Sequence, residues 1–145
     1  MKYKAFCKFE LIAASREEAI SEMLELFPAG EQTRGLLASG LEVREQVGAT
    51  VVHKGIALPH CRSILVDRLT IAIGRSAEGI PWPLEKVHTV VLFISPVKPN
   101  GAEEHSIFLS HIARCIRDSG DRIAAVSGQQ ELLDLLNFQT EEQEG

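Results

Sequence analysis

Residues 87–95 constrain the fold of this chain more than any other segment does. They read Val-His-Thr-Val-Val-Leu-Phe-Ile-Ser, a nearly continuous apolar run without the polar alternation of a strand that has one face in water. Such a strand is buried on both faces, so helices must cover the sheet from both sides. The run is far shorter than the roughly 20 apolar residues that a bilayer span needs. The segment therefore predicts a central strand in an α/β fold.

Periodic patterns place a strand and two helices ahead of this run. Residues 3–12 alternate in part between apolar and polar side chains and predict a first strand. The stretch Ser15-Arg16-Glu17-Glu18 is a capping box that opens a helix. A second helix is predicted over residues 31–46, and Arg44 and Glu45 in its last turn fit a solvated helix end. The inward face of this helix is predicted to carry Leu36, Leu37, Leu41 and Val47.

The second half of the chain continues the alternation of strands and helices. Residues 69–75 predict a strand, whereas residues 79–83, with two prolines around a tryptophan, predict a loop. A helix is predicted over residues 102–118, followed by two further helical segments. The helical spacing places His105 toward the core and His111 toward water.

Composition and charge narrow the class of protein. With 145 residues, of which 45% are hydrophobic, the chain has the size of one domain with its own core. Residues 1–138 are predicted to form this domain, and residues 139–145, acidic and without an apolar anchor, a flexible tail. A net charge of −5 without a basic block argues against nucleic acid as a partner. No segment suggests a signal peptide or membrane insertion, so we expect a cytoplasmic protein.

The octapeptide Gly55-Ile56-Ala57-Leu58-Pro59-His60-Cys61-Arg62 places a histidine at the end of a stiff extended run. Pro59 fixes its own φ and keeps Leu58 extended. A ring nitrogen of His60, held in this way, can act as a nucleophile, and the cation of Arg62 can meet the negative charge of the product. The alternative is a histidine that only caps the strand and bonds a carbonyl group.

Three chemical sites are compatible with this segment. In the first, His60 accepts a phosphoryl group while His105, near a helix N-terminus that favours anions, supplies hydrogen-bond donors. In the second, a metal ion is bound by His53, His60, Cys61 and His105, although adjacent residues of an extended segment point to opposite faces. In the third, Cys61 is a nucleophile whose pKa Arg62 lowers, against the alternative of a buried thiol that acts as a small apolar side chain.

Four motifs in a fixed order make the chain similar to a known family. They are Arg44-Glu45 ahead of a threonine, Gly55-Ile56-Ala57-Leu58-Pro59-His60, Glu78-Gly79-Ile80-Pro81-Trp82, and Glu104-His105 at the start of a helix. From about Leu11 to Leu136 the chain resembles the fructose/mannitol-type enzyme IIA domain of the bacterial phosphoenolpyruvate-dependent phosphotransferase system, including its nitrogen-regulatory members. The resemblance implies a three-layer α/β/α sandwich with a mixed central sheet.

The resemblance also implies a function and a set of site residues. His60 would accept a phosphoryl group from a histidine-containing phosphocarrier protein and pass it to a transporter domain or a regulatory protein. His105 and Arg44 would stabilise the phosphate, without a metal ion or an organic cofactor. Sugar transport and regulation remain open as the downstream role. The contrasting hypothesis is an interaction module with the same fold that is not phosphorylated.

One departure from the family pattern lies just before the histidine segment. The family usually has a glycine-containing turn here, whereas this chain has Thr50-Val51-Val52-His53-Lys54. A branched residue such as Val51 does not easily adopt a positive φ, so the turn is either reshaped here or needs no such conformation. We expect any effect of Val51 and His53 to fall on partner recognition and transfer rather than on the acceptor histidine.

Overall fold

The computed structural model describes residues 3–47, 51–53, 55–83, 85–97 and 101–140. In chain order the elements are β1 (Tyr3–Lys8), α1 (Arg16–Leu24), α2 (Glu31–Val47), β2 (Val51–His53), β3 (Ile56–Ala57), β4 (His60–Ser63), β5 (Thr70–Pro81), β6 (Lys86–Pro96), α3 (Gly101–Ala124), α4 (Gln129–Leu136) and β7 (Phe138–Thr140). No helix in this described part of the chain is long and apolar enough to cross a bilayer.

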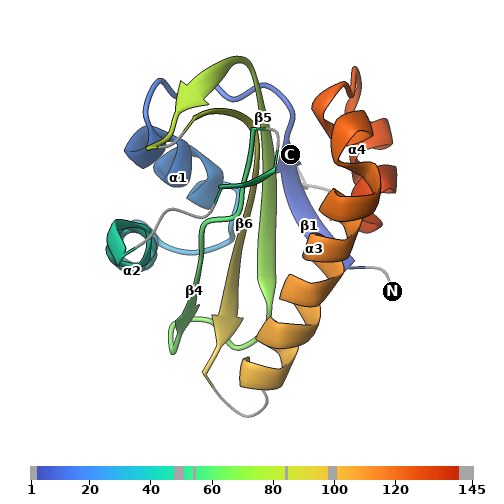
Figure 1. The fold of residues 1–145 in the computed structure, drawn as a ribbon. Helices are drawn as coiled ribbons and strands as arrows, with labels where there is room; N and C mark the ends of the chain where they lie inside the picture. The colour runs from blue at the N-terminus through green and yellow to red at the C-terminus, as the bar shows by residue number, and fades with distance from the viewer. Residues whose placement is uncertain (1–2, 48–50, 54, 84, 98–100, 141–145) are drawn as a thin grey trace.

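The structure is a three-layer α/β/α sandwich, as predicted, with a mixed sheet in the middle (Figure 1). Helices α1 and α2 cover one face, and α3 and α4 cover the other. Strand β6 explains why its sequence is almost continuously apolar. Val91 and Phe93 belong to the core beneath α3 and α4, whereas Val90, Leu92 and Ile94 belong to the core beneath α1 and α2. Both faces of the strand are therefore buried, and neither can carry polar side chains at low cost.

The sheet order brings the ends of three elements together. Strands β3 and β4 pair in parallel with the same edge of the central strand β6. His60, at the start of β4, lies opposite Phe93. On its other edge β6 pairs antiparallel with β5, where Ile94 lies opposite Thr70. Helix α3 begins shortly after β6 ends at Pro96. His60, the end of β6 and the first turns of α3 therefore share one end of the sandwich.

The end of β5 differs from the prediction because strand pairing overrides the local sequence. Residues 79–81 were expected in a loop, but β5 continues to Pro81 and pairs with β6 through Ile80 and Val87. Gly79 makes this possible with a φ of 87°, which accommodates the irregular register between Arg75 and Ile80. Trp82 then lies in the tight connection to β6, buried as a loop anchor.

The end of the chain also differs from the prediction. The domain was expected to end at residue 138, yet β7 continues through Gln139 and Thr140, which pair with Lys4 and Ala5 of β1. Residues 141–145 of the predicted tail lie outside the described residues. The predicted helix end at residue 118 agrees with the structure, because α3 consists of two helical segments that meet at a kink at Ser119, where φ is −134° and ψ is 15°.

The inward face of α2 is narrower than predicted. Its buried residues are Leu37, Leu41 and Glu45, which follow an i, i+4, i+8 spacing. The predictions for Leu36 and Val47 are wrong, because these side chains are 55% and 84% exposed. Only one stripe of α2 contacts the sheet, so leucine and valine outside it face solvent whatever their hydrophobicity.

Candidate functional site

His60 is the first residue of β4, and its ring is held in one orientation. The side chain is only 8% exposed and stacks on Phe93, with ring centroids 4.8 Å apart and an interplanar angle of 5°. Its Nδ1 lies 2.7 Å from the carbonyl oxygen of Leu58. A carbonyl oxygen only accepts, so Nδ1 carries the proton and the lone pair of the neutral ring is on Nε2. The free lone pair of the ring at this strand end is therefore on Nε2.

His105 lies beside this ring, as the predicted inward orientation requires. The two imidazole centroids are 5.2 Å apart, and His105 also contacts Phe93 at the same centroid distance. Its Nδ1 is 2.8 Å from Oγ of Ser95, a fully buried residue near the end of β6. Sequence reasoning missed Ser95, because a serine at the end of an apolar strand carries no local signal. This hydroxyl fixes the ring of His105 and leaves its Nε2 for an incoming group.

Arg44 completes the constellation from the last turn of α2. This half-buried guanidinium lowers the pKa of both His60 and His105, so its charge acts on both rings. Arg62 also lowers the pKa of His105, from its place on β4 two residues beyond His60. The three residues predicted for a phosphoryl site, His60, His105 and Arg44, therefore come from three separate elements and act on one region.

The prediction of a solvated helix end at Arg44 and Glu45 is wrong for the glutamate. Glu45 is 2% exposed, and its Oε2 accepts a hydrogen bond from Nε1 of Trp82 at 3.2 Å. His111 was expected to face water and does not. Its Nε2 donates to the carbonyl oxygen of Leu136 at 2.9 Å, and its ring packs against Tyr3. Both errors have one cause: helical spacing gives the faces of a helix but not what covers each face.

Burial keeps His60 neutral over most of the physiological pH range. Removal of the ring from water lowers its pKa below the ordinary value, the nearby cation of Arg44 lowers it further, and the Leu58 carbonyl and Glu45 partly oppose this. A neutral ring has the free Nε2 lone pair that attack on phosphorus requires. This electrostatic environment therefore favours nucleophilic reactivity at neutral pH.

We expect phosphorylation to be independent of pH from neutrality down to the usual histidine range and to fall below it. The reason is that the pKa of His60 is lowered, so its ring becomes protonated only below the ordinary histidine pKa of about 6.5. The measurement is the initial rate of transfer against pH, with the pKa of His60 followed by NMR. A midpoint above the ordinary value would contradict this prediction, provided that the donor protein is shown to be stable across the range.

The thiol alternative finds no support in the geometry, and the side chain of His53, one of the residues of the metal alternative, lies outside what the structure describes. Cys61 packs against the α1 and α2 side of the sheet, with its Sγ 3.8 Å from the position that a Cβ at Gly40 would take. Burial raises the pKa of Cys61 to about 11, so Arg62 does not activate it. The thiol is a small, half-buried side chain. In the described part of the chain no group of three or more His, Cys, Asp or Glu residues is close enough to bind a metal ion.

Two residues of the segment that replaces the expected glycine-containing turn, Thr50 and Lys54, lie outside the described residues. Val51 and His53 lie in β2, which pairs antiparallel with β3 across a register irregularity. Extended backbone suits a branched residue. Gly55 takes the left-handed conformation in this segment, with a φ of 75°, and its N–H donates to Oε1 of Glu85 at 2.8 Å. Among the described residues only Asn137 combines a side chain with a positive φ.

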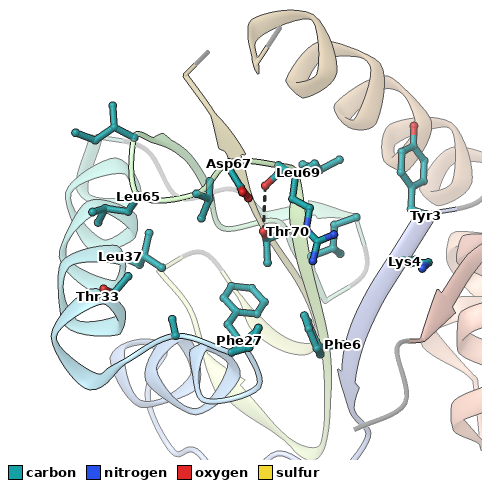
Figure 2. Close-up of a pocket in the computed structure, with 16 residues that line it drawn as sticks. Tyr3, Lys4, Phe6, Phe27, Thr33, Leu37, Leu65, Asp67, Leu69 and Thr70 are labelled. Atoms are coloured by element: carbon teal, nitrogen blue, oxygen red, sulfur yellow. Dashed lines mark hydrogen bonds between the residues drawn. The ribbon is translucent and has the colours of Figure 1, made fainter. Parts of the chain in front are cut away.

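A cavity of about 600 Å³ lies elsewhere, between the end of α1, the start of α2 and the connection from β4 to β5. Figure 2 shows Phe27, Leu37 and Leu65 around it. Its lining includes none of His60, His105 and Arg44. The histidine pair therefore does not line this cavity, which is of the size that small-molecule ligands occupy.

The comparison with protein families decides the relationship. Residues 4–139 match the family described as "Phosphoenolpyruvate-dependent sugar phosphotransferase system, EIIA 2". The chain belongs to this EIIA family. The resemblance seen in the sequence is thereby confirmed over almost the whole domain, and the protein is a component of a phosphotransferase system.

Individual relatives agree with this assignment. The EIIA domain is 31% identical over 128 residues to a protein named "PTS system fructose-specific EIIA component" from Haloferax volcanii, covering 85% of this chain and 83% of that protein. Its fold is similar to Nitrogen Regulatory Protein IIA-Ntr from Neisseria meningitidis, with a TM-score of 0.70, 22% identity and 92% of each chain covered. It is also similar to the complex of enzyme IIAMTL and phosphorylated enzyme IIBMTL from Escherichia coli, with a TM-score of 0.67, 19% identity, and coverage of 90% of this chain and 92% of that chain.

Proposed function

We propose that this EIIA domain carries a phosphoryl group on Nε2 of His60. The single observation that supports this most strongly is the 2.7 Å contact between His60 Nδ1 and the Leu58 carbonyl oxygen, which leaves Nε2 unprotonated in the neutral ring. In the reaction the Nε2 lone pair forms a bond to phosphorus while the N–P bond of the donor's phosphohistidine breaks. The proton on Nδ1 stays in place, so no general base is needed.

His105 and Arg44 stabilise the transferred group. The charge on a phosphoryl group in transfer spreads over three equatorial oxygens, and catalysis consists mostly of positioning and electrostatic stabilisation. The guanidinium of Arg44 is a permanent cation with planar donors suited to phosphate oxygens. His105, held by Ser95, offers its Nε2 side to the same group. This division of roles makes His60 the acceptor and the other two residues its stabilisers.

The donor is a histidine-containing phosphocarrier protein, and the acceptor is a IIB-type transporter domain. The name of the Haloferax relative supports a role in sugar uptake, and the mannitol complex contains a phosphorylated IIB partner for a protein of this fold. A phosphoryl group adds about 1.5 to 2 negative charges, so partner binding also differs between the two forms. A site that exchanges phosphoryl groups between proteins needs an accessible surface around the histidine.

The test is an intact-mass measurement after incubation with phosphoenolpyruvate and the upstream phosphotransfer proteins. We expect the gain of one phosphoryl group that is lost in acid. When a IIB acceptor is added, this group should be transferred to that protein. ³¹P NMR distinguishes attachment at Nε2 from attachment at Nδ1. A chain that binds its partners but never gains the group is an interaction module, and a group attached at Nδ1 would contradict the assignment of the nucleophilic atom.

Exposed apolar side chains on α2 form a docking surface for these partners. Leu36, Val43 and Val47 are 55%, 63% and 84% exposed, and Arg44 lies between the two valines. A charge placed among them should weaken docking without touching the chemistry. We expect Val43→Asp to raise the KM for the donor protein about five- to tenfold, which corresponds to roughly 1–1.4 kcal/mol, with kcat nearly unchanged.

The matched control for this substitution is Ile12→Asp. Ile12 is 85% exposed, and the N–H of its neighbour Leu11 donates to the carbonyl oxygen of Arg75 in the middle of β5, away from Thr70, which pairs with Ile94 near the end of β6. Transfer kinetics of the control should equal those of the parent. Equal KM values for Val43→Asp and the parent would mean that donors dock elsewhere.

A further inference from the structure

Glu45 and Trp82 come from two of the sequence motifs and have no part in the chemistry described so far, yet they meet in the core. Glu45 follows Arg44 on α2, and Trp82 closes the connection between β5 and β6, 37 residues away in sequence. Nε1 of Trp82 donates to Oε2 of Glu45 at 3.2 Å. The two residues are 2% and 6% exposed. This contact therefore joins the last turn of α2 to the hairpin on the sheet.

A carboxylate in this position is not explained by packing. Removing an ionised carboxyl group from water is unfavourable unless it is paired and hydrogen-bonded, and an apolar side chain of similar volume would often be at least as stabilising. The neighbouring buried residues of the same stripe, Leu37 and Leu41, are apolar. A role other than filling space is therefore expected for the charge of Glu45.

The location of Glu45 indicates that role. Its negative charge raises the pKa of His60, while the cation of Arg44 lowers it. The two residues are consecutive in α2, so the bond that anchors Glu45 to Trp82 also anchors the backbone that carries Arg44. Four charged or titratable groups bear on the two imidazoles. Arg44 of α2 acts on both rings, Glu45 of α2 acts on His60, and Arg62 and His60 of β4 act on His105.

We propose that Glu45, held by the indole of Trp82, is a positioning residue that fixes the last turn of α2 and so directs Arg44 toward the phosphoryl group on His60. Its carboxylate also offsets part of the Arg44 charge at the imidazole, which keeps the ring basic enough to be an effective nucleophile. This inference rests on the proposed phosphorylation of His60. It extends that proposal by adding an indole and a carboxylate that never touch the phosphate.

Two substitutions separate the charge from the hydrogen bond. Glu45→Gln keeps an acceptor oxygen for Trp82 and removes the charge, whereas Trp82→Phe keeps the charge and removes the donor. We expect each variant to slow phosphoryl transfer about 10- to 100-fold, the cost of a misplaced stabilising group, with the KM for the donor protein unchanged. NMR titration of the unphosphorylated protein should show a lower pKa of His60 in Glu45→Gln, because a nearby negative charge has been lost.

Glu22→Gln is the matched control, because Glu22 is another buried carboxylate and has no part in the chemistry proposed for the histidine pair. It is 9% exposed, pairs with Nζ of Lys8 at 2.7 Å and accepts hydrogen bonds from the backbone of Ile12 and Ala13. Its loss should lower stability but leave the pKa of His60 and the transfer rate at parental values. If Glu22→Gln changes the pKa of His60 and the transfer rate as much as Glu45→Gln does, general destabilisation explains both results.

The outcome that overturns the inference is a change in unfolding free energy without a change in either site-specific measurement. If both variants retain the parental pKa of His60 and the parental transfer rate, Glu45 and Trp82 are structural only. If Glu45→Gln does not fold, Trp82→Phe decides through the transfer rate. If the parent protein is never phosphorylated, the proposed function fails, while the pKa of His60 still tests whether Glu45 acts on the ring.

Discussion

His60→Ala abolishes acid-labile phosphorylation, because the substitution removes the only atom proposed to form the bond to phosphorus. We do not expect the neighbouring ring of His105 to take over this reaction, since its Nδ1 contacts the hydroxyl of Ser95 and not a carbonyl oxygen such as that of Leu58, which keeps the proton of His60 on Nδ1. The measurement is intact mass before and after incubation with the complete donor system. Undiminished labelling of the variant would mean that the acceptor is another residue.

The stability of this variant needs its own measurement. From the sequence, His60 was expected at an exposed strand end, where substitution costs little stability. The structure corrects this, because the ring is 8% exposed and stacked on Phe93. We expect His60→Ala to lose about 1–3 kcal/mol of unfolding free energy, and His60→Gln to lose less. Loss of labelling in a His60→Gln protein that is still folded excludes unfolding as the cause.

His111→Ala provides the matched control for loss of a partly buried ring that packs on aromatic side chains. His111 packs between Tyr3 and Phe138 and bonds the Leu136 carbonyl, so its removal also destabilises the fold. It lies on α3 like His105 but has no contact with the His60 ring among the described interactions. We expect a lower unfolding free energy with full phosphorylation of His60.

Arg44→Ala and His105→Ala slow phosphoryl transfer by about 10²–10³-fold and leave slow labelling at His60, which is the usual cost of removing one preorganised stabilising donor. Arg44→Ala should also raise the pKa of His60, since the cation that lowers it is gone. A ring that becomes more basic while transfer becomes slower would show that Arg44 acts on the transferred charge. Single-turnover rates and the NMR titration of His60 measure the two effects separately.

Ser95→Ala is a milder substitution that tests the role of His105 in phosphoryl transfer. It removes the hydroxyl 2.8 Å from Nδ1 but leaves the imidazole itself in place. Its rate should fall between that of the parent and that of His105→Ala, because the ring remains but is less well oriented. If His105→Ala transfers at the parental rate, the residue contributes to structure alone and Arg44 carries the stabilisation.

Patterns within single segments were sufficient for most of the fold. The apolar run of residues 87–95 predicted a strand buried on both faces, and β6 has that environment, with its side chains divided between two cores. The N-cap predicted at Ser15 is present, with the hydroxyl accepting from the N–H of Glu18 at 3.2 Å, while the Glu18 carboxylate accepts from the N–H of Ala14. These features are local, since the period of a segment and its cap residues depend on neighbours a few positions away.

The sequence also identified His60, because a proline before a histidine at a strand end constrains the backbone directly. It could not reveal what surrounds the ring. The stacking on Phe93 depends on the parallel register of β4 and β6, and the bond from Ser95 to His105 depends on where α3 crosses the end of the sheet. Neither the strand order nor the packing of a helix on a sheet is encoded in a single segment.

The limits are clearest for α2 and α3. Their periodicity gave correct helices but wrong environments for Glu45 and His111, both expected in water and both found in contact with other elements. A polar side chain can be buried wherever a distant segment supplies its hydrogen-bond partner, as Trp82 and Leu136 do here. The sequence by itself therefore determined most of the elements and the family, and it pointed to His60 as the residue for which we propose the acceptor role. The tertiary structure alone decided which charges meet at that histidine, because electrostatic and hydrogen-bond partners are set by proximity in space rather than along the chain.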